Sequence, residues 1–488
     1  MKRTTVRLAA VPLVALLALS GCGGDLGGGS STGREASAPN YSEREEGGDR
    51  SPLENPQSTF AVDVDTASYG YARRVIRDGN LPDPTMVRPE EFVNSFDQDY
   101  PEPRGDGFAV FADGTRPPAA HRAEGDVRIM RVGLQTRSET EFRRPDASLT
   151  FVVDVSGSMA EPGRLDLVRD ALQTLVDQLR PTDAVAIVSF SDKARVLREM
   201  TRVSEKADLR AAIDRLRPEG STNLGAGLKL GYRVARDGFR EGTSNRVIVL
   251  SDGLANTGDT EADSILRRVR DEAAKQIALL GVGVGSDYGD ALMEQLADDG
   301  DGFAVYVSEP SQARDVFVNR LPATLEVRAL DAKVQVTFDP KSVKDYRLIG
   351  YENRAVADED FRNDKVDGGE VGPGHSVTAL YEVRLAGDRD LGAEVASVRV
   401  RWLDPDDRTP AEASHRVSVA DLDRGFEEAA PRLTVDYVAA YLAETLRGGE
   451  PAIPLSDLRR IADRSADRTS DAAVSELADL VARAEGLR

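Results

Sequence analysis

The chain has 488 residues, and its 84 Asp and Glu against 63 Lys and Arg give a formal net charge of −21. At about 150 residues per domain, this length indicates roughly three domains; the 40% hydrophobic fraction is that of a globular protein. The acidic surplus argues against nucleic acid as a partner, because neutralising phosphates requires a basic face. A single cysteine excludes an intrachain disulfide and a cysteine-based zinc site. The three histidines (His121, His375 and His415) are far apart in sequence, which argues against a His-rich metal site.

The first 21 residues have the pattern of an export signal. Lys2, Arg3 and Arg7 precede an apolar stretch, Leu8 to Leu19, that is too short to span a bilayer as a helix. The stretch runs into Leu19-Ser20-Gly21-Cys22, which resembles the lipobox of bacterial lipoproteins, whose cysteine becomes the lipidated first residue after cleavage. We therefore expect a lipoprotein signal peptide in residues 1–21 and a lipid on Cys22. The alternative is an ordinary secretory signal that happens to contain a cysteine.

Residues 22–57 are predicted to be a flexible tether. They contain a Gly27-Gly28-Gly29-Ser30-Ser31 run followed by mixed charges and prolines, and they show no apolar periodicity. No later run reaches about 18 apolar residues, so nothing else in the chain is expected to cross a membrane. The expected location is the extracytoplasmic face of the cell membrane, with the lipid as the only membrane anchor.

Two kinds of pattern follow the tether. Residues 58–147, an N-terminal flanking region, mix short strands with short helices, whereas residues 148–325 alternate regularly between buried strands and amphipathic helices. This alternation predicts an α/β fold with a doubly wound, mostly parallel sheet covered by helices on both faces. In the flanking region we predict strands at 60–64, 108–112 and 127–135 and helices at 68–77 and 88–96. In the α/β region we predict strands at 149–153, 184–190, 247–250, 277–282 and 303–307 and helices at 164–179, 209–216, 224–234, 263–274, 291–296 and 311–321.

Oxygen-bearing side chains follow two of these strands. Asp154-Val155-Ser156-Gly157-Ser158 comes directly after the first strand, Ser251-Asp252-Gly253 follows the third, and Gly220-Ser221-Thr222-Asn223 begins a helix between them. In an open parallel sheet the ligand site lies at the carboxyl ends of the strands, so these side chains are expected to converge. Two carboxylates with several hydroxyls suit Mg²⁺, which retains several waters, better than they suit a calcium cage.

The same residues resemble the metal-ion-dependent adhesion site of the von Willebrand factor type A family, whose pattern is D-x-S-x-S, then a Thr, then an Asp. Here the matching positions are Asp154, Ser156, Ser158, Thr222 and Asp252. The resemblance implies that a divalent cation, Mg²⁺ or else Ca²⁺ or Mn²⁺, is bound mainly by the hydroxyls, with the two Asp acting directly or through water. In that family one coordination position stays open for a carboxylate of a partner protein, which implies adhesion and not catalysis. The alternative is that these residues are only turn and cap residues.

Both flanks of the α/β region resemble a bacterial family of von Willebrand factor A lipoproteins. Residues 60–101 are similar to its N-terminal region, and residues 329–402 are similar to its C-terminal domain, whose function is uncharacterised. We hypothesise one β-sandwich built from the strands of both flanks, with the α/β domain inserted between them. In a C-terminal β domain, residues 326–425, we predict antiparallel strands at 333–338, 346–351, 376–385 and 395–402. In the C-terminal residues 426–488 we predict helices at 433–446, 455–463 and 471–485.

Three further segments resemble nucleotide-binding or serine-hydrolase motifs but do not match them completely. The Gly281 to Gly285 run follows a strand, but Ser286 stands where a dinucleotide-binding motif has its third glycine. The Gly220 to Gly227 segment has Ala226 in place of the P-loop lysine. The serine-hydrolase pattern G-x-S-x-G occurs at 29–33, within the tether, without the strand and helix that such a site needs.

Two acidic segments and one tryptophan have a structural and a functional interpretation. Asp63-Val64-Asp65-Thr66 imitates the metal motif, but we expect Asp65 or Thr66 to cap the following helix, with a second metal site as the alternative. Asp298 to Gly302 lacks the full EF-hand loop and is expected to be a solvated turn. Trp402 is expected in the core of the sandwich, with an interface contact as the alternative.

The expected function is that of a lipid-anchored, adhesion-type module that uses a divalent cation to bind an acidic residue of a partner protein. The alternative is an envelope assembly or scaffold protein whose metal site serves stability. A metal-assisted hydrolase would need a general base beside the cation, for which the sequence offers no convincing candidate. We therefore expect that the protein is not an enzyme.

Overall fold

The computed structural model describes residues 48–488, apart from 63–64, 106, 139–144, 254–261, 274, 286–292, 294–295, 298–299, 301, 303, 308–315, 318–327, 365, 367, 388–389, 406 and 449–450. The predicted signal peptide, Cys22 and most of the predicted tether lie outside the described residues. So do most of the helices predicted at 291–296 and 311–321 and most of the acidic segment 298–302. No helix in the described part of the chain has both the length and the apolar character that crossing a bilayer requires.

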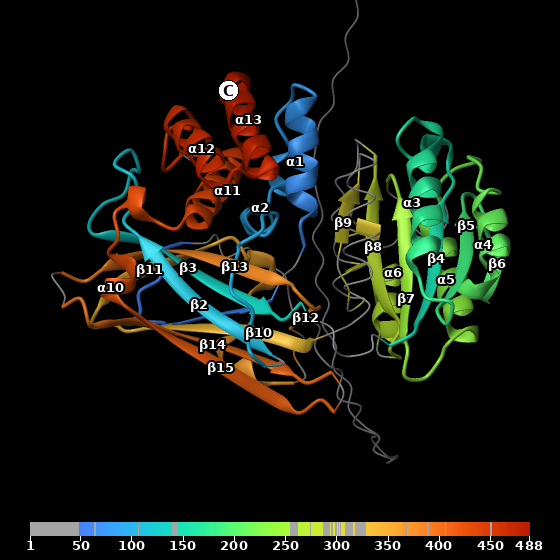
Figure 1. The fold of residues 1–488 in the computed structure, drawn as a ribbon, viewed down its shortest axis with the longest axis horizontal. Coiled ribbons are helices and arrows are strands. Elements are labelled where there is room, and N and C mark those ends of the chain that lie inside the picture. The colour runs from blue at the N-terminus through green and yellow to red at the C-terminus, as the bar shows by residue number, and fades with distance from the viewer. Residues whose placement is uncertain are drawn as a thin grey trace, which may run out of the picture. The chain divides into compact units, whose positions relative to one another are not determined.

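A six-stranded sheet with the order β6-β5-β4-β7-β8-β9 forms the α/β part of the chain (Figure 1). Five of its strands are parallel, and β6 pairs antiparallel with β5 at one edge. The predicted mostly parallel sheet is thereby confirmed. The strands are β4 (Ala147–Asp154), β5 (Ala184–Phe190), β6 (Ala194–Arg202), β7 (Ser244–Ser251), β8 (Ala278–Val284) and β9 (Ala304–Val307).

Helices cover both faces of this sheet because alternate residues of its central strand point into different hydrophobic cores. Phe151 of β4 packs in a core with residues of α3 (Leu165–Gln178) and α4 (Lys206–Ile213). Its neighbour Val152 packs in a second core with residues of α5 (Leu224–Asp237) and α6 (Ala262–Ala273). The near-continuous apolar run of β4 is therefore explained by burial on both sides, and the doubly wound arrangement is confirmed.

Strand β6 is absent from the predicted elements. Its sequence, ARVLREMTR, mixes apolar and charged residues, and most of its side chains are only partly buried. Charged residues are typical of an edge strand, where they discourage pairing with another chain. A charge-rich strand has no strong apolar run, so its sequence resembles that of a loop.

The strands of the two flanks form two packed antiparallel sheets. One has the order β1-β10-β14-β15, with β12 paired to β10, and the other has the order β11-β13-β3-β2. Strand β3 pairs with β13 along its length, so that Val132 faces Ala379, and β1 pairs with β10. Both sheets share one hydrophobic core, which confirms the hypothesis of a sandwich built from both flanks. The strands are β1 (Gln57–Ala61), β2 (Phe108–Thr115), β3 (Val127–Thr136), β10 (Ala329–Phe338), β11 (Val343–Ile349), β12 (Gly369–Val371), β13 (Ser376–Leu385), β14 (Glu394–Leu403) and β15 (Pro410–Ser418).

Some strands of the sandwich differ from the prediction, whereas the position of Trp402 agrees with it. Strand β1 begins and ends three residues before the predicted 60–64, and β12 and β15 are additional to the predicted strands. Trp402 packs against the sandwich core and meets the ring of Phe108 edge to face at 5.3 Å between centroids, as expected.

A group of helices packs against the outer face of the sheet that contains β3 and β13 (Figure 1). Their apolar residues form one core together with Ile129, Ile349 and Leu380 of that sheet. The helices are α1 (Ala67–Arg77), α2 (Pro89–Val93), α11 (Pro431–Arg447), α12 (Leu455–Thr469) and α13 (Ala472–Leu487). The shorter helical turns of the described residues are η1 (Pro84–Met86), η2 (Gly157–Ala160), η3 (Val203–Glu205), η5 (Glu352–Arg354), η6 (Asp358–Arg362), α10 (Val419–Leu422) and η7 (Phe426–Glu428).

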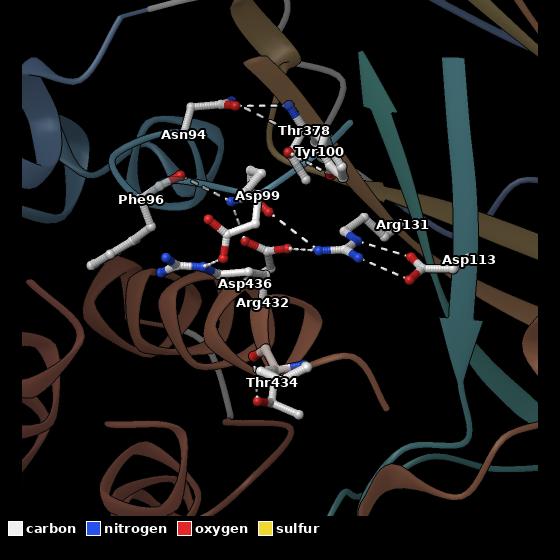
Figure 2. A network of polar contacts seen from close by, with 12 residues as sticks. Asn94, Phe96, Asp99, Tyr100, Asp113, Arg131, Thr378, Arg432, Thr434 and Asp436 are labelled. Atoms are coloured by element: carbon white, nitrogen blue, oxygen red, sulfur yellow. Dashed lines mark hydrogen bonds and ion pairs between the residues drawn. The ribbon is translucent and has the colours of Figure 1, made fainter. Parts of the chain in front are cut away.

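Polar residues connect helix α11 to the sandwich within this apolar group. Figure 2 shows the guanidinium of Arg131, on β3, between Asp113 of β2 and Asp436 of α11. Arg131 donates to both oxygens of Asp113 at 2.9 and 2.8 Å and to Oδ2 of Asp436 at 3.0 Å. The amide of Gln98 donates to Oδ1 of Asp436 at 2.7 Å. Because each buried charge has a hydrogen-bonded partner, the network avoids the cost of an uncompensated buried ion.

Candidate metal centre at the carboxyl edge of the sheet

The topology of the α/β sheet brings the predicted loops together. Strands β4 and β7 are parallel neighbours, so their carboxyl ends, Asp154 and Ser251, lie at the same edge. The loop after β4 is held at its base by Val155 N, which donates to Phe190 O at 2.8 Å. It also contacts the loop before α5, because Gly157 N donates to Gly220 O at 3.0 Å. Three loops that are distant in sequence thus meet at one point.

Three of the predicted ligands form a continuous chain of hydrogen bonds. The hydroxyl oxygens of Ser156 and Ser158 lie 3.1 Å apart, and Ser158 Oγ donates to Asp252 Oδ1 at 2.9 Å. Ser156 and Asp252 are buried, whereas Ser158 is exposed. The chain therefore has two buried ends, and its middle member, Ser158, reaches the surface.

Asp154 lies beneath this chain and is fully buried. Its Oδ1 accepts a hydrogen bond from Ser156 N at 2.8 Å, and its Oδ2 accepts one from Ser251 Oγ at 2.6 Å. Burial raises the pKa of the Asp154 carboxyl to about 6, although the hydrogen bonds from Ser251 and Ser156 lower it. A nearby positive charge would favour the ionised carboxylate that these donors already orient.

Thr222 lies in the loop that precedes α5, with only 5% of its surface exposed. Its neighbour Asn223 fixes the loop in two ways: Asn223 N donates to Ser191 O at 2.9 Å, and its Oδ1 accepts from Ala226 N at 2.9 Å as the N-cap of the helix. Gly220 begins the loop with a φ of +67°, a conformation that glycine adopts without strain. The backbone contact between Gly220 and Gly157 places this loop beside the one that carries the two serines.

Two residues outside the predicted set also contact the site. Ser251 bonds Asp154, as described, and Arg164 Nη1 donates to Asp252 Oδ2 at 2.6 Å. Ser251 is adjacent to Asp252 in the sequence, so the sequence pattern could have predicted that its hydroxyl belongs to the site. Arg164 begins a helix, and nothing in its sequence context indicates that its side chain turns toward a loop after another strand.

The hydrogen-bonded oxygen atoms of the chain are also close enough together to be neighbouring ligands of one cation. With bonds of about 2.1 Å to Mg²⁺, adjacent ligand oxygens lie about 3.0 Å apart. The separations of 3.1 Å and 2.9 Å between Ser156, Ser158 and Asp252 match that value. Hydroxyls and two carboxylates are also the hard donors that Mg²⁺ prefers. Among the described residues no group of three or more His, Cys, Asp or Glu could hold a metal ion, so any ion at this edge depends on the hydroxyls.

The second acidic motif has a structural role in the described contacts. Oδ1 of Asp65 accepts a hydrogen bond from Ala304 N of β9 at 3.0 Å, and Oδ2 accepts one from Arg354 Nη2 at 2.9 Å. The expected helix cap is wrong: Thr66 occupies the N-cap position of α1 without a side-chain cap bond. Instead, Ser68 N donates to Glu91 Oε2 at 2.8 Å. Asp63 and Val64 lie outside the described residues.

Comparisons with known proteins agree with the fold of the α/β domain. Residues 148–319 match the family model of the von Willebrand factor type A domain, and residues 35–124 match a model described as von Willebrand factor. Residues 323–487 match the model of the C-terminal part of the uncharacterized protein YfbK. The sandwich strands of the C-terminal flank and helices α11 to α13 fall within this last match.

The chain is also similar to individual proteins. The chain is 35% identical over 378 residues to the uncharacterized protein YfbK of Escherichia coli (strain K12), an alignment that covers 72% of this chain and 65% of YfbK. It is 30% identical over 191 residues to the uncharacterized protein sll0103 of Synechocystis sp., covering 39% of this chain and 44% of that protein. A solved von Willebrand factor type A structure from Catenulispora acidiphila has a TM-score of 0.45 at 18% identity and covers 77% of this chain and 89% of that one. The chain spans less than two thirds of the length of YfbK and of sll0103.

The chain therefore contains a von Willebrand factor type A domain, in residues 148–319, and domains of this family often mediate protein interactions. More specifically, it joins a type A domain to a YfbK C-terminal domain and is homologous to Escherichia coli YfbK. The family predicted from the sequence is confirmed in these respects. The lipidation of Cys22 stays a prediction.

Proposed function

We propose that the protein is a surface-tethered module that binds a partner protein through a divalent cation held at the carboxyl edge of the type A sheet. Ser156, Ser158 and Thr222 would hold the ion, with Asp154 and Asp252 contributing directly or through water. When bound, the cation supplies a hard positive charge with a coordination position open to a carboxylate of the partner. Mg²⁺ suits this donor set best, and Mn²⁺ or Ca²⁺ are the alternatives.

The observation that carries the proposal is the spacing of the site oxygens. Hydrogen bonds of 3.1 and 2.9 Å hold the oxygens of Ser156, Ser158 and Asp252 close together, which supports the binding of one ion among them. The exposure of Ser158 supports access from solvent, while the burial of Asp154 supports a fixed inner side. Such a preorganised half-open site lowers the cost of binding an external ligand.

Isothermal titration of the full chain with Mg²⁺ and Mn²⁺ tests the ion site. We expect saturable binding to the wild type and none to Asp154→Ala. Glu412→Ala is the matched control, because Glu412 is a carboxylate of strand β15 that pairs with Arg362. Equal binding to the wild type and Asp154→Ala would contradict the proposed site.

Proximity crosslinking on intact cells tests the partner interaction. We expect the wild type to label a protein that is lost after EDTA treatment and with Asp154→Ala but retained with Glu412→Ala. The scaffold alternative predicts a different result, in which EDTA lowers the melting temperature while the crosslinked partner is unchanged.

The proposed location is the extracytoplasmic face of the cell membrane, through a lipid on Cys22. The support is the lipobox-like Leu19-Ser20-Gly21-Cys22 at the end of an apolar stretch. Metabolic labelling with a radioactive fatty acid should mark the wild type and not Cys22→Ser, and the variant should leave the membrane fraction. Membrane association of unlabelled Cys22→Ser would contradict the proposal.

We also propose that the site binds without turnover. A metal-assisted hydrolase needs a general base that is positioned beside the bound substrate as well as the cation. The carboxylates of Asp154 and Asp252 are already engaged by Ser251, Ser156, Ser158 and Arg164. A hydrolytic activity that disappears with Asp252→Ala would contradict this part of the proposal.

A further inference from the structure

Arg164 occupies an unusual position for a cationic side chain, inside a candidate cation site. It is the N-cap residue of α3, and only 5% of its side chain is exposed. Its Nη1 donates to Asp252 Oδ2 at 2.6 Å and to Ser158 O at 3.2 Å. Its Nη2 lies 2.6 Å from Glu161 Oε2. The guanidinium is therefore bonded to one predicted ligand through its carboxylate and to another through its backbone.

The space for this side chain is provided by Gly285, at the end of β8. Gly285 has a φ of +96°, and a Cβ atom at this position would lie 2.9 Å from Arg164 Nε and 3.1 Å from its Cγ. A larger residue would push the Arg164 side chain away from Asp252. The last glycine of the Gly281 to Gly285 run, which does not complete a dinucleotide motif, thus has a role in placing this arginine.

The contacts of Asp252 show what the arginine does for this carboxylate. Ser158 Oγ bonds Oδ1 and Arg164 Nη1 bonds Oδ2, so both oxygens of this buried carboxylate have a hydrogen-bonded partner. A buried carboxylate without a counter-charge is strongly destabilising. The ion pair removes that cost and keeps the loop after β7 in place.

We propose that Arg164 is the resident counter-cation of Asp252, which keeps the site formed without metal and weakens the binding of the divalent ion. This inference rests on the proposed function, since it concerns the regulation of the same site. Arg164 already compensates the negative charge of Asp252, so this carboxylate attracts a second cation less strongly. The fixed guanidinium also repels an ion that binds beside it. The metal would therefore exchange readily with the medium, and partner binding would follow the cation concentration outside the cell.

Cation titration of the full chain with Arg164 variants tests this inference. Arg164→Gln removes the charge, and Arg164→Met removes it while keeping an unbranched stem against Gly285, in case the first variant does not fold. Both should bind Mg²⁺ and Mn²⁺ on the order of tenfold more tightly than the wild type, whereas Arg164→Lys should stay close to it. Arg195→Gln is the matched control, because Arg195 is an exposed arginine of the same domain that pairs with Glu219.

Thermal unfolding in EDTA provides a second readout. Arg164→Gln and Arg164→Met should melt at a lower temperature than the wild type without metal, and saturating Mg²⁺ should raise their melting temperatures by more than it raises that of the wild type.

The outcomes separate this inference from the proposed function. Binding to the wild type with equal or weaker binding to both charge-removing variants overturns the inference alone. Binding only to the charge-removing variants supports the inference and overturns the proposed function, since the arginine would then replace the ion. Absence of binding to every protein overturns both.

Discussion

Arg131 Nη1 lies 3.0 Å from Asp436 Oδ2, and this contact joins a central strand of the sandwich to the long helix of the C-terminal region (Figure 2). Both side chains are almost completely buried. The two residues are 305 positions apart in the sequence, and one precedes the type A domain while the other follows it. The pair therefore helps to unite two segments that the inserted domain separates.

Asp436→Ala should destabilise the flanking domain strongly. Of the two carboxylates described above as partners of the buried Arg131, the substitution leaves Asp113 and removes the other. It also removes the acceptor of the Gln98 amide. Breaking a buried pair from one side typically costs about 3–5 kcal/mol, and retention of Asp113 places the expected loss near 3 kcal/mol. Urea unfolding measures the loss, with Asp463→Ala on the exposed face of α12 as the control. A similar loss of unfolding free energy in both variants would contradict the stabilising role of the Arg131–Asp436 pair.

The same pair predicts a dependence of stability on pH. Burial raises the pKa of the Asp436 carboxyl to about 6 from 3.8, although Arg131 and Gln98 lower it. The folded state then binds this proton more tightly than the unfolded chain does. Its contribution to stability is therefore present in acid and is lost as the pH rises from about 4 to about 6, by up to roughly 3 kcal/mol.

Urea unfolding at several pH values between about 4 and 7, in EDTA, checks this prediction. Asp436→Asn removes the titrating group while keeping a side chain of the same shape. The difference in unfolding free energy between Asp436→Asn and the wild type should change across this range in the stated direction. A difference that stays constant with pH would show that Asp436 does not titrate there.

Ser251→Ala should weaken cation binding without removing a proposed ligand. The hydroxyl donates to Asp154 Oδ2 at 2.6 Å and orients that carboxylate toward the site. Loss of a hydrogen bond that orients a ligand typically lowers metal affinity by about 10–100-fold. Titration with Mn²⁺ measures the change, and Ser251→Thr, which keeps the hydroxyl, should retain most of the affinity. Unchanged affinity in Ser251→Ala would contradict the orienting role of this hydroxyl.

Asn223→Ala should loosen the loop that carries Thr222. The side chain of Asn223 caps α5 by accepting from Ala226 N at 2.9 Å. Removing such a cap costs about 1 kcal/mol. Urea unfolding measures this cost, and Asn223→Asp should recover most of it because a carboxylate accepts the same bond. If both substitutions cost the same, the cap does not stabilise this helix.

The amino-acid sequence alone determined the class of the central domain and the location of its candidate site. Buried strands such as Leu149–Val153 and amphipathic helices such as 164–179 are visible in a short window, because their periodicity depends on neighbours along the chain. The rule that ligands bind at the carboxyl ends of parallel strands then placed Asp154, Ser158 and Asp252 at one edge. The contacts between the last two agree with that placement.

Only the tertiary structure decided which distant groups meet. Arg164 contacts Asp252 because β4 and β7 are neighbours and because Gly285 leaves room, and neither condition has a local signal in the sequence. Asp65, whose surroundings predict a helix cap, instead accepts hydrogen bonds from Ala304 and Arg354, which are more than 200 positions away in the sequence. Local patterns report the period of a segment, whereas ion pairs between remote segments depend on how the sheets and helices pack.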